Sequence, residues 1–194
     1  YETIDLTAFE DSINYLPIDA IKVSDDQSNI RTEGVITKIV SHKQAFIEDD
    51  LSAIAIYGDI ANLKVGDYIE LTGIKTTYKG NPQIINFTYQ ILLENYEILP
   101  TITLSDDITE DELIRYLGKR IQLDNLYMIS LNEDTYGNIN FECLHTPSNI
   151  TFKGFYDARL VDSHIDKEYL LTLYDKTFNV DNIILSWEDG FILH

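Results

Sequence analysis

The feature that most constrains the fold is a series of short apolar runs in the first half of the chain, each cut off by polar turn residues. The runs cover residues 30–40, 46–48, 53–57, 68–72 and 83–93. Apolar and polar residues that alternate with a period of two are typical of strands with one buried face. A long strand, a hairpin, a connector and a second hairpin follow the order of a five-stranded Greek-key barrel, the OB-fold.

The second half of the chain repeats this plan. Thr7 and Thr109 each precede a glutamate by three residues, which is the signature of a helix N-terminal capping box. We therefore expect a short helix up to about Asn14 and another before Gly118, each leading into a long strand. The strand at 68–72 is matched to 168–172, 54–57 to 150–156, and 83–93 to 183–187.

These matches predict an all-β chain of two tandem OB-fold barrels, each preceded by a short helix. The first domain is expected at residues 1–100 and the second at 101–194, joined by a very short linker near Pro100. The alternative is one barrel followed by an unrelated β-rich extension. The predicted core consists of Val35, Ile39, Phe46, Ile54, Ile56, Ile69, Leu71, Ile121, Leu123, Phe141, Phe152 and Leu171.

Three glycines carry predictions about the backbone. Gly34, inside the first long strand, predicts a bulge or a sharp bend. Gly66 predicts the turn before the fourth strand, and Gly80 predicts a hairpin turn with positive φ.

The chain is strongly acidic, with 14 basic and 33 acidic residues and a formal net charge of −19. The part up to Pro100 has 16 acidic and 7 basic residues, hence −9, and the remainder has 17 and 7, hence −10. Because binding to nucleic acids depends on neutralising phosphates, this balance disfavours generic DNA or RNA binding.

The sequence contains no recognisable catalytic or metal-binding motif. The single cysteine, Cys143, excludes an intrachain disulfide and lies in an alternating apolar run that predicts a buried thiol. The four histidines lack the spacing of a metal site, and the acidic clusters lack that of a calcium loop. We therefore expect no enzyme activity, no metal and no cofactor. Trp187 is expected to be a core or interface aromatic residue.

The ligand surface of an OB-fold barrel usually includes one face and two loops. In the first barrel these positions carry lysines, which make the surface less acidic, and tyrosines, which could stack on bases or sugar rings. Ordinary surface residues are the alternative interpretation. The candidate ligand-binding residues are Lys43, Tyr57, Lys75, Tyr78, Lys79 and Tyr89.

Segments 30–36, 46–49, 54–57 and 65–71, together with 116–125 at the opening of the second barrel, resemble a known family. They are similar to the tandem OB-fold domains of bacterial cell-envelope lipoproteins, and related domains accompany secreted nucleases and phosphoesterases. The resemblance covers most of the chain. It implies an exported, non-enzymatic accessory module whose ligand is unidentified.

Three functional classes follow from these observations. The first is a non-enzymatic binding or scaffolding module of the bacterial envelope, with an unknown ligand or protein partner. The second is a binder of single-stranded nucleic acid or oligosaccharide through the first barrel, and the third is an accessory domain of a secreted nuclease or phosphoesterase. The chain begins at Tyr1 rather than Met, which together with the resemblance predicts export after removal of a signal. No segment approaches the ~20 apolar residues of a membrane span.

Overall fold

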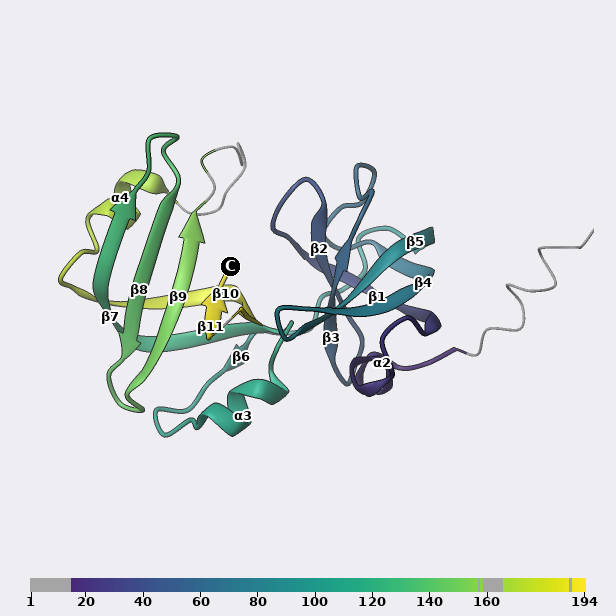
Figure 1. The fold of residues 1–194 in the computed structure, drawn as a ribbon, viewed down its shortest axis with the longest axis horizontal. Helices are drawn as coiled ribbons and strands as arrows, with labels where there is room; N and C mark the ends of the chain where they lie inside the picture. The colour runs from purple at the N-terminus through teal and green to yellow at the C-terminus, as the bar shows by residue number, and fades with distance from the viewer. Residues whose placement is uncertain (1–14, 157, 159–165, 189) are drawn as a thin grey trace, which may run out of the picture. The chain divides into compact units, whose positions relative to one another are not determined.

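The computed structural model describes residues 15–156, 158, 166–188 and 190–194, so the helix expected at residues 7–14 lies outside the described part (Figure 1). The chain divides into two compact units. One contains Tyr1–Tyr78 and Pro82–Ile98, and the other contains Lys79–Asn81 and Leu99–His194. Each unit is described here by itself.

The first unit is a closed five-stranded barrel with the strand order β1-β2-β3-β5-β4, which is OB-fold topology and confirms the predicted fold. β3 and β5 are parallel, whereas the β1–β2, β2–β3 and β1–β4 pairs are antiparallel. Its strands are β1 (Asn29–Ile39), β2 (Gln44–Glu48), β3 (Ala53–Tyr57), β4 (Tyr68–Tyr78) and β5 (Asn81–Leu93).

A short helix before the first strand contributes to the core of this barrel. α2 (Ile18–Val23) buries Ile18 and Ile21 completely, and both side chains belong to the barrel core. Its N-terminus is capped by a residue far away in the sequence, because the Ile18 amide donates to Asp49 Oδ2 at 2.7 Å. The same carboxylate forms the β2–β3 turn, where Oδ1 accepts from the amides of Leu51 at 2.9 Å and Ser52 at 2.7 Å.

The second unit has the same connectivity. Its sheet runs β10-β11-β9-β8-β7-β6, and an additional antiparallel pairing of β10 with β7 closes it in the order β7-β8-β9-β11-β10. As in the first barrel, the third and fifth strands, β9 and β11, are parallel. The strands are β6 (Ile102–Thr103), β7 (Arg120–Glu133), β8 (Ile139–His145), β9 (Ile150–Tyr156), β10 (Thr177–Trp187) and β11 (Phe191–Leu193).

Two short helices accompany this second barrel. α3 (Glu110–Arg115) starts at the predicted capping box, with Thr109 and Glu112 bonding reciprocally, which confirms that prediction. α4 (Lys167–Leu171) begins after Asp166, whose carboxylate accepts from two amides of the first turn.

The prediction that residues 168–172 form a strand was therefore wrong. Leu170 and Leu173 are three residues apart and both buried, which is helical spacing, and Asp166 supplies the helix cap. The true counterpart of β4 is β10, so residues 183–187 end the fourth strand rather than forming the last one. The last strand is the short β11.

The cores agree with the predicted positions except at two residues. Ile39 and Leu171 are only partly buried and pack against the edges of the two cores, because one ends β1 and the other ends α4. Cys143 is completely buried, as predicted, and burial raises the pKa of its thiol to about 12. Trp187 is partly buried and meets Phe191 edge-on at 5.0 Å between ring centroids.

Gly34 does not mark the irregularity of the first strand. The register of β1 against β2 shifts between Ile36 and Lys38, whereas Gly34 itself is regularly paired with Ile69. Gly34 instead allows close packing, because a Cβ added there would lie 2.6 Å from the carbonyl oxygen of Glu48. Gly66 and Gly80 have φ of 93° and 85°, as their predicted turns require.

Candidate functional site

Lys75 does not present its charge to solvent. Its side chain is 7% exposed and Nζ lies 2.7 Å from Asp26 Oδ1, with Thr77 as a second partner. Hydrogen bonds from Lys75 and Thr77 lower the pKa of the Asp26 carboxyl. This lysine therefore holds the segment before β1 onto β4.

Four of the other predicted residues form two separate groups, at opposite ends of β3. Lys43 lies in the β1–β2 loop, and its carbonyl accepts from the Gly58 amide at 2.9 Å, next to the exposed Tyr57. Tyr78 and Lys79 lie at the β4–β5 turn. Because β5 runs parallel to β3, the turn before β5 lies beside the first residues of β3. Tyr57 is the last residue of β3 and therefore lies at the opposite end.

Tyr89 is only partly available to a ligand. It is partly buried against the first core, with its ring centroid 6.2 Å from that of Phe87. Between Ala45 and Ile56, moreover, β2 and β3 present no exposed side chain. Among the predicted residues that are distant in sequence, the structure therefore brings only Lys43 and Tyr57 together.

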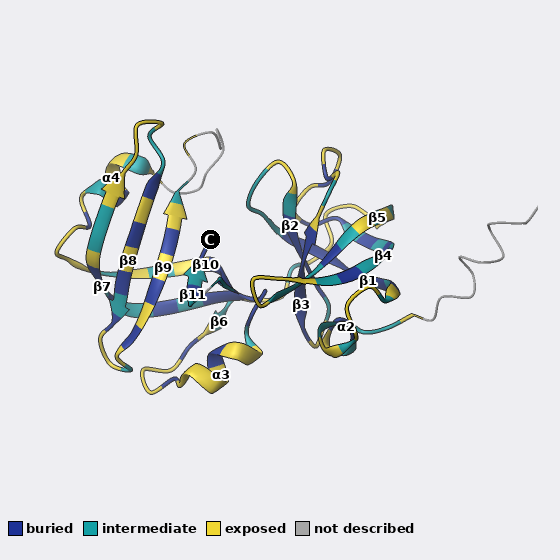
Figure 2. Cartoon of the chain, viewed as in Figure 1, coloured by how far each residue is buried: buried dark blue, intermediate teal, exposed yellow. Residues whose placement is uncertain are grey.

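The same face of the second barrel is open. Along β8 and β9, buried and exposed residues alternate strictly over most of the strand length (Figure 2). The inner residues belong to the second core, and the outer ones face solvent together with those of β7. We call this surface the β7–β9 face. Strand register places its residues in three cross-strand rows: Asn132, Asn140 and Phe155; Ser130, Glu142 and Lys153; Tyr127, Leu144 and Thr151.

The β7–β9 face has the dimensions of a small-ligand platform. Neighbouring strands lie about 5 Å apart, and rows two residues apart are separated by about 7 Å, so the face spans roughly 10 by 14 Å. Phe155 is 41% exposed at one end, and Tyr136 in the adjoining β7–β8 loop is 83% exposed. Rings, amides and hydroxyls are thus displayed side by side on a rigid sheet.

The electrostatics of this face suit an uncharged ligand. Its only charged members are Glu142 and Lys153, which are cross-strand neighbours of opposite sign. Beside the face, Glu133 at the end of β7 is paired with Lys167 at 2.6 Å, and Asp134 follows in the loop. A row of lysines and arginines for phosphates is absent from the nine residues of the face.

The sequence carries a signal for this face, although none of the six candidate lysines and tyrosines lies on it. Residues 139–145 and 150–156 alternate cleanly, which is how a half-buried sheet differs from one covered on both sides. The all-apolar run at 53–56 in the first barrel is typical of the covered kind.

A serine, a histidine and an aspartate also come together in the second unit. His145 Nδ1 lies 2.6 Å from Ser148 Oγ, and Nε2 lies 3.9 Å from Asp106 Oδ1. The imidazole is 1% exposed, the serine follows three residues later in the β8–β9 turn, and the aspartate is beyond hydrogen-bond distance. This arrangement secures the turn and offers a substrate no access to the imidazole.

We expect His145 to make the stability depend on pH. Burial lowers its pKa, an effect that Asp106 only partly opposes, so the folded state favours the neutral imidazole. The unfolded state then binds a proton first, and the free energy of unfolding falls as pH drops below about 6.5. Urea titrations at neutral and mildly acidic pH should show a smaller decrease for His145→Gln than for the wild type. Burial also lowers the pKa of His194, to about 4, and this histidine makes the same contribution to the pH dependence in the wild type and in the variant. Equal decreases would contradict the prediction.

A hollow of about 220 Å³ lies beside α3 and has its polar groups already engaged. Glu112 belongs to the capping box with Thr109, and Asp107 accepts from Ser105. Within the described residues, no group of three or more His, Cys, Asp or Glu is placed to hold a metal ion. None of the helices in the described part is long and apolar enough to cross a membrane.

Comparison with known proteins adds little to this picture. The sequence matches no protein-family model and no curated protein. Among solved structures, the hypothetical protein ygiW from E. coli is 18% identical, with a TM-score of 0.35 over 38% of this chain and 85% of that one. The Ifi202 HINa domain in complex with 20-bp dsDNA is 12% identical, with a TM-score of 0.37 over 87% and 92% of the two chains. A Replication Protein A heterotrimer bound to ssDNA is 10% identical, with a TM-score of 0.33 over 94% and 68%. Because these scores are low, the fold assignment depends on strand order.

Proposed function

We propose that this chain is a non-enzymatic ligand-binding module of the bacterial cell envelope, and that the β7–β9 face binds an uncharged oligosaccharide. The observation that carries the proposal is the open three-strand face, with its rows of amides, hydroxyls and aromatic rings. The envelope role follows from the resemblance to envelope lipoprotein domains, and fractionation of the native host tests it.

The chemistry of the face supports this ligand class. A sugar ring has a C–H face that packs on an aromatic ring and an edge of hydroxyls that both donate and accept hydrogen bonds. Phe155 supplies the ring, and the amides of Asn132 and Asn140 each offer a donor and an acceptor. Glu142 accepts and Lys153 donates at the next row, one strand spacing apart.

Nucleic acid fits this face less well. Stacking on Phe155 would serve a base as well as a sugar, but each phosphate would meet a domain with a net charge of −10. At about 0.15 M salt, charges within ~8 Å of the ligand still act on it. The face offers a phosphate a single lysine, Lys153, which lies beside Glu142, and Asp134 in the adjoining loop adds a further negative charge.

The test is a titration of ¹⁵N-labelled protein with neutral oligosaccharides of glucose, mannose and N-acetylglucosamine, alongside a labelled dT oligomer. We expect saturable amide shifts on β7, β8 and β9 with at least one sugar, and no binding of the oligomer at about 0.15 M salt. Asn140→Ala should weaken sugar binding about tenfold, since it removes two hydrogen-bonding groups from the face.

Tyr174→Ala is the matched control, because this tyrosine is 59% exposed in the same unit but outside the face. It should bind like the wild type. Shifts confined to Lys43 and Tyr57 would place the site on the first barrel instead. Salt-sensitive binding of dT that is lost in a Lys43→Glu, Lys79→Glu double variant would favour the nucleic-acid alternative, and absence of sugar binding would refute the ligand class.

A further inference from the structure

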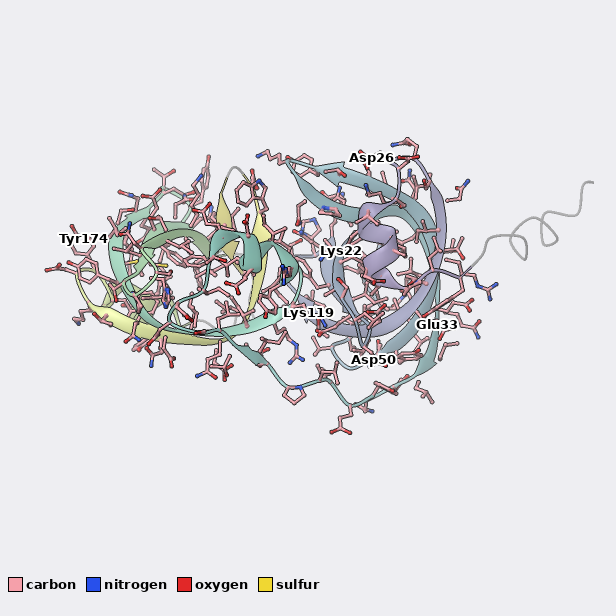
Figure 3. The ribbon with its side chains drawn as sticks, turned by 90° about the horizontal axis from the view of Figure 1, so that it is seen from below. Lys22, Asp26, Glu33, Asp50, Lys119 and Tyr174 are labelled. Carbon is pink, nitrogen blue, oxygen red and sulfur yellow. The ribbon has the colours of Figure 1, made fainter. Side chains whose placement is uncertain are left out.

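A second surface, on the first barrel, combines a carboxylate with exposed tyrosine rings. In the pairing of β1 with β4, Glu33 lies opposite Glu70, and the buried Val35 lies opposite Tyr68. Two glutamates directly opposite each other repel, so this pairing needs compensation. Figure 3 labels Glu33 on the outside of the first barrel.

Only one of the two glutamates has a described positive partner. Arg31 Nη2 lies 2.9 Å from Glu70 Oε2 and neutralises it. Glu33 accepts a hydrogen bond from the Tyr68 hydroxyl at 2.9 Å, which is a neutral donor. Within the described residues, no ion pair of Glu33 is found, so its negative charge is left uncompensated beside Glu70.

Three tyrosines lie on or beside the strands that carry this charge. The rings of Tyr68 and Tyr96 lie 4.8 Å apart between centroids with a tilt of 31°, and Tyr96 is 46% exposed. Tyr15, 50% exposed, pairs with Arg31 in an isolated parallel bridge next to β1. Burial, and then the charges of Glu33 and Asp49, raise the pKa of Tyr15.

The Tyr68 hydroxyl of this cluster stays protonated and therefore uncharged. Burial, and then the hydrogen bond to Glu33, raises the pKa of Tyr68 to about 12, with smaller contributions from Tyr15 and Tyr96. The phenol is therefore neutral throughout the physiological range. An uncompensated carboxylate and electron-rich rings that remain neutral both attract a cation.

We propose that Glu33, Tyr15, Tyr68 and Tyr96 form a binding site for a quaternary ammonium group. A trimethylammonium cation is weakly hydrated and offers no N–H donors, so it loses little by leaving water for the face of an aromatic ring. An inorganic divalent cation would need six or more oxygen ligands, which a single uncompensated carboxylate does not supply. The site is independent of the β7–β9 face, so either proposal can fail without the other.

The probe is choline, compared with its neutral isostere 3,3-dimethylbutan-1-ol, by NMR titration of the labelled protein. We expect saturable shifts of the amides around Glu33, Tyr68 and Tyr96, with a dissociation constant of about 1 mM. The isostere has the same shape without the charge and should bind at least about tenfold more weakly.

Variants separate the contributions of charge and rings. Glu33→Gln should weaken choline binding about tenfold and remove its salt dependence, and Tyr96→Leu should weaken it about fivefold. The control Tyr174→Leu removes a tyrosine of the second unit that is 59% exposed, and it should leave binding unchanged. Retained amide dispersion verifies that each variant is folded. Equal binding of the isostere, full binding by Glu33→Gln, or shifts that do not saturate with choline would each overturn the proposal.

Discussion

Phe152→Ala should lower the free energy of unfolding of the second unit by about 4 kcal/mol, the largest effect expected of a single side chain here. Phe152 is completely buried in the middle of β9, and its ring lies 5.9 Å from that of Phe191 on the parallel strand β11. Removing it leaves a cavity where β8, β9 and β11 meet, and strands held in a closed barrel cannot collapse to fill it. Urea unfolding monitored by NMR signals of β9 measures the loss.

Phe155→Ala provides the control, with the same chemical change three residues later on the opposite face of the strand. Because Phe155 is already 41% exposed, we expect a loss of about 1 kcal/mol or less. Comparable losses in the two variants would contradict the assignment of inner and outer faces. The same variant is expected to impair sugar binding, so it separates the ligand surface from the core.

Gly34→Ala should destabilise the first barrel by about 3 kcal/mol. The added Cβ would lie 2.6 Å from the Glu48 carbonyl oxygen and 2.8 Å from Ile47 Cγ1. The carbonyl belongs to the backbone of the paired strand β2, so relief requires the two strands to separate. The expected result is a lower urea midpoint and faster amide exchange along β1 and β2.

Gly58→Ala is the comparison for this substitution. Its new Cβ would lie 3.0 Å from the edge of the Phe87 ring, which is a side chain and can shift. We expect a loss below about 1 kcal/mol. If Gly34→Ala were equally mild, the close approach of β1 to β2 would not be a constraint on the fold.

Local signals in the sequence were sufficient for most of the architecture. Short apolar runs cut off by turn residues identified the five strands of the first barrel, and the capping box at Thr109 identified α3. Both depend on residues within a few positions of one another, so their physical causes are complete within the segment. The prediction for residues 168–172 was wrong because five residues with mixed apolar spacing fit either period, whereas the Asp166 cap and the burial of Leu170 in the second core both favour the helix.

The candidate sites depended on long-range packing. Lys75 appeared to be a surface cation, but its partner Asp26 is 49 residues away in the sequence. Glu33 appeared to be one acid among 33, and only the register of β1 against β4 places Glu70 opposite it.

The sequence by itself determined which residues alternate and therefore which can share a face of a sheet. The tertiary structure alone decided which of those faces stays open, because exposure depends on every segment that packs against a strand. That is why the β7–β9 face stays open, while β2 and β3 of the first barrel are buried on both sides.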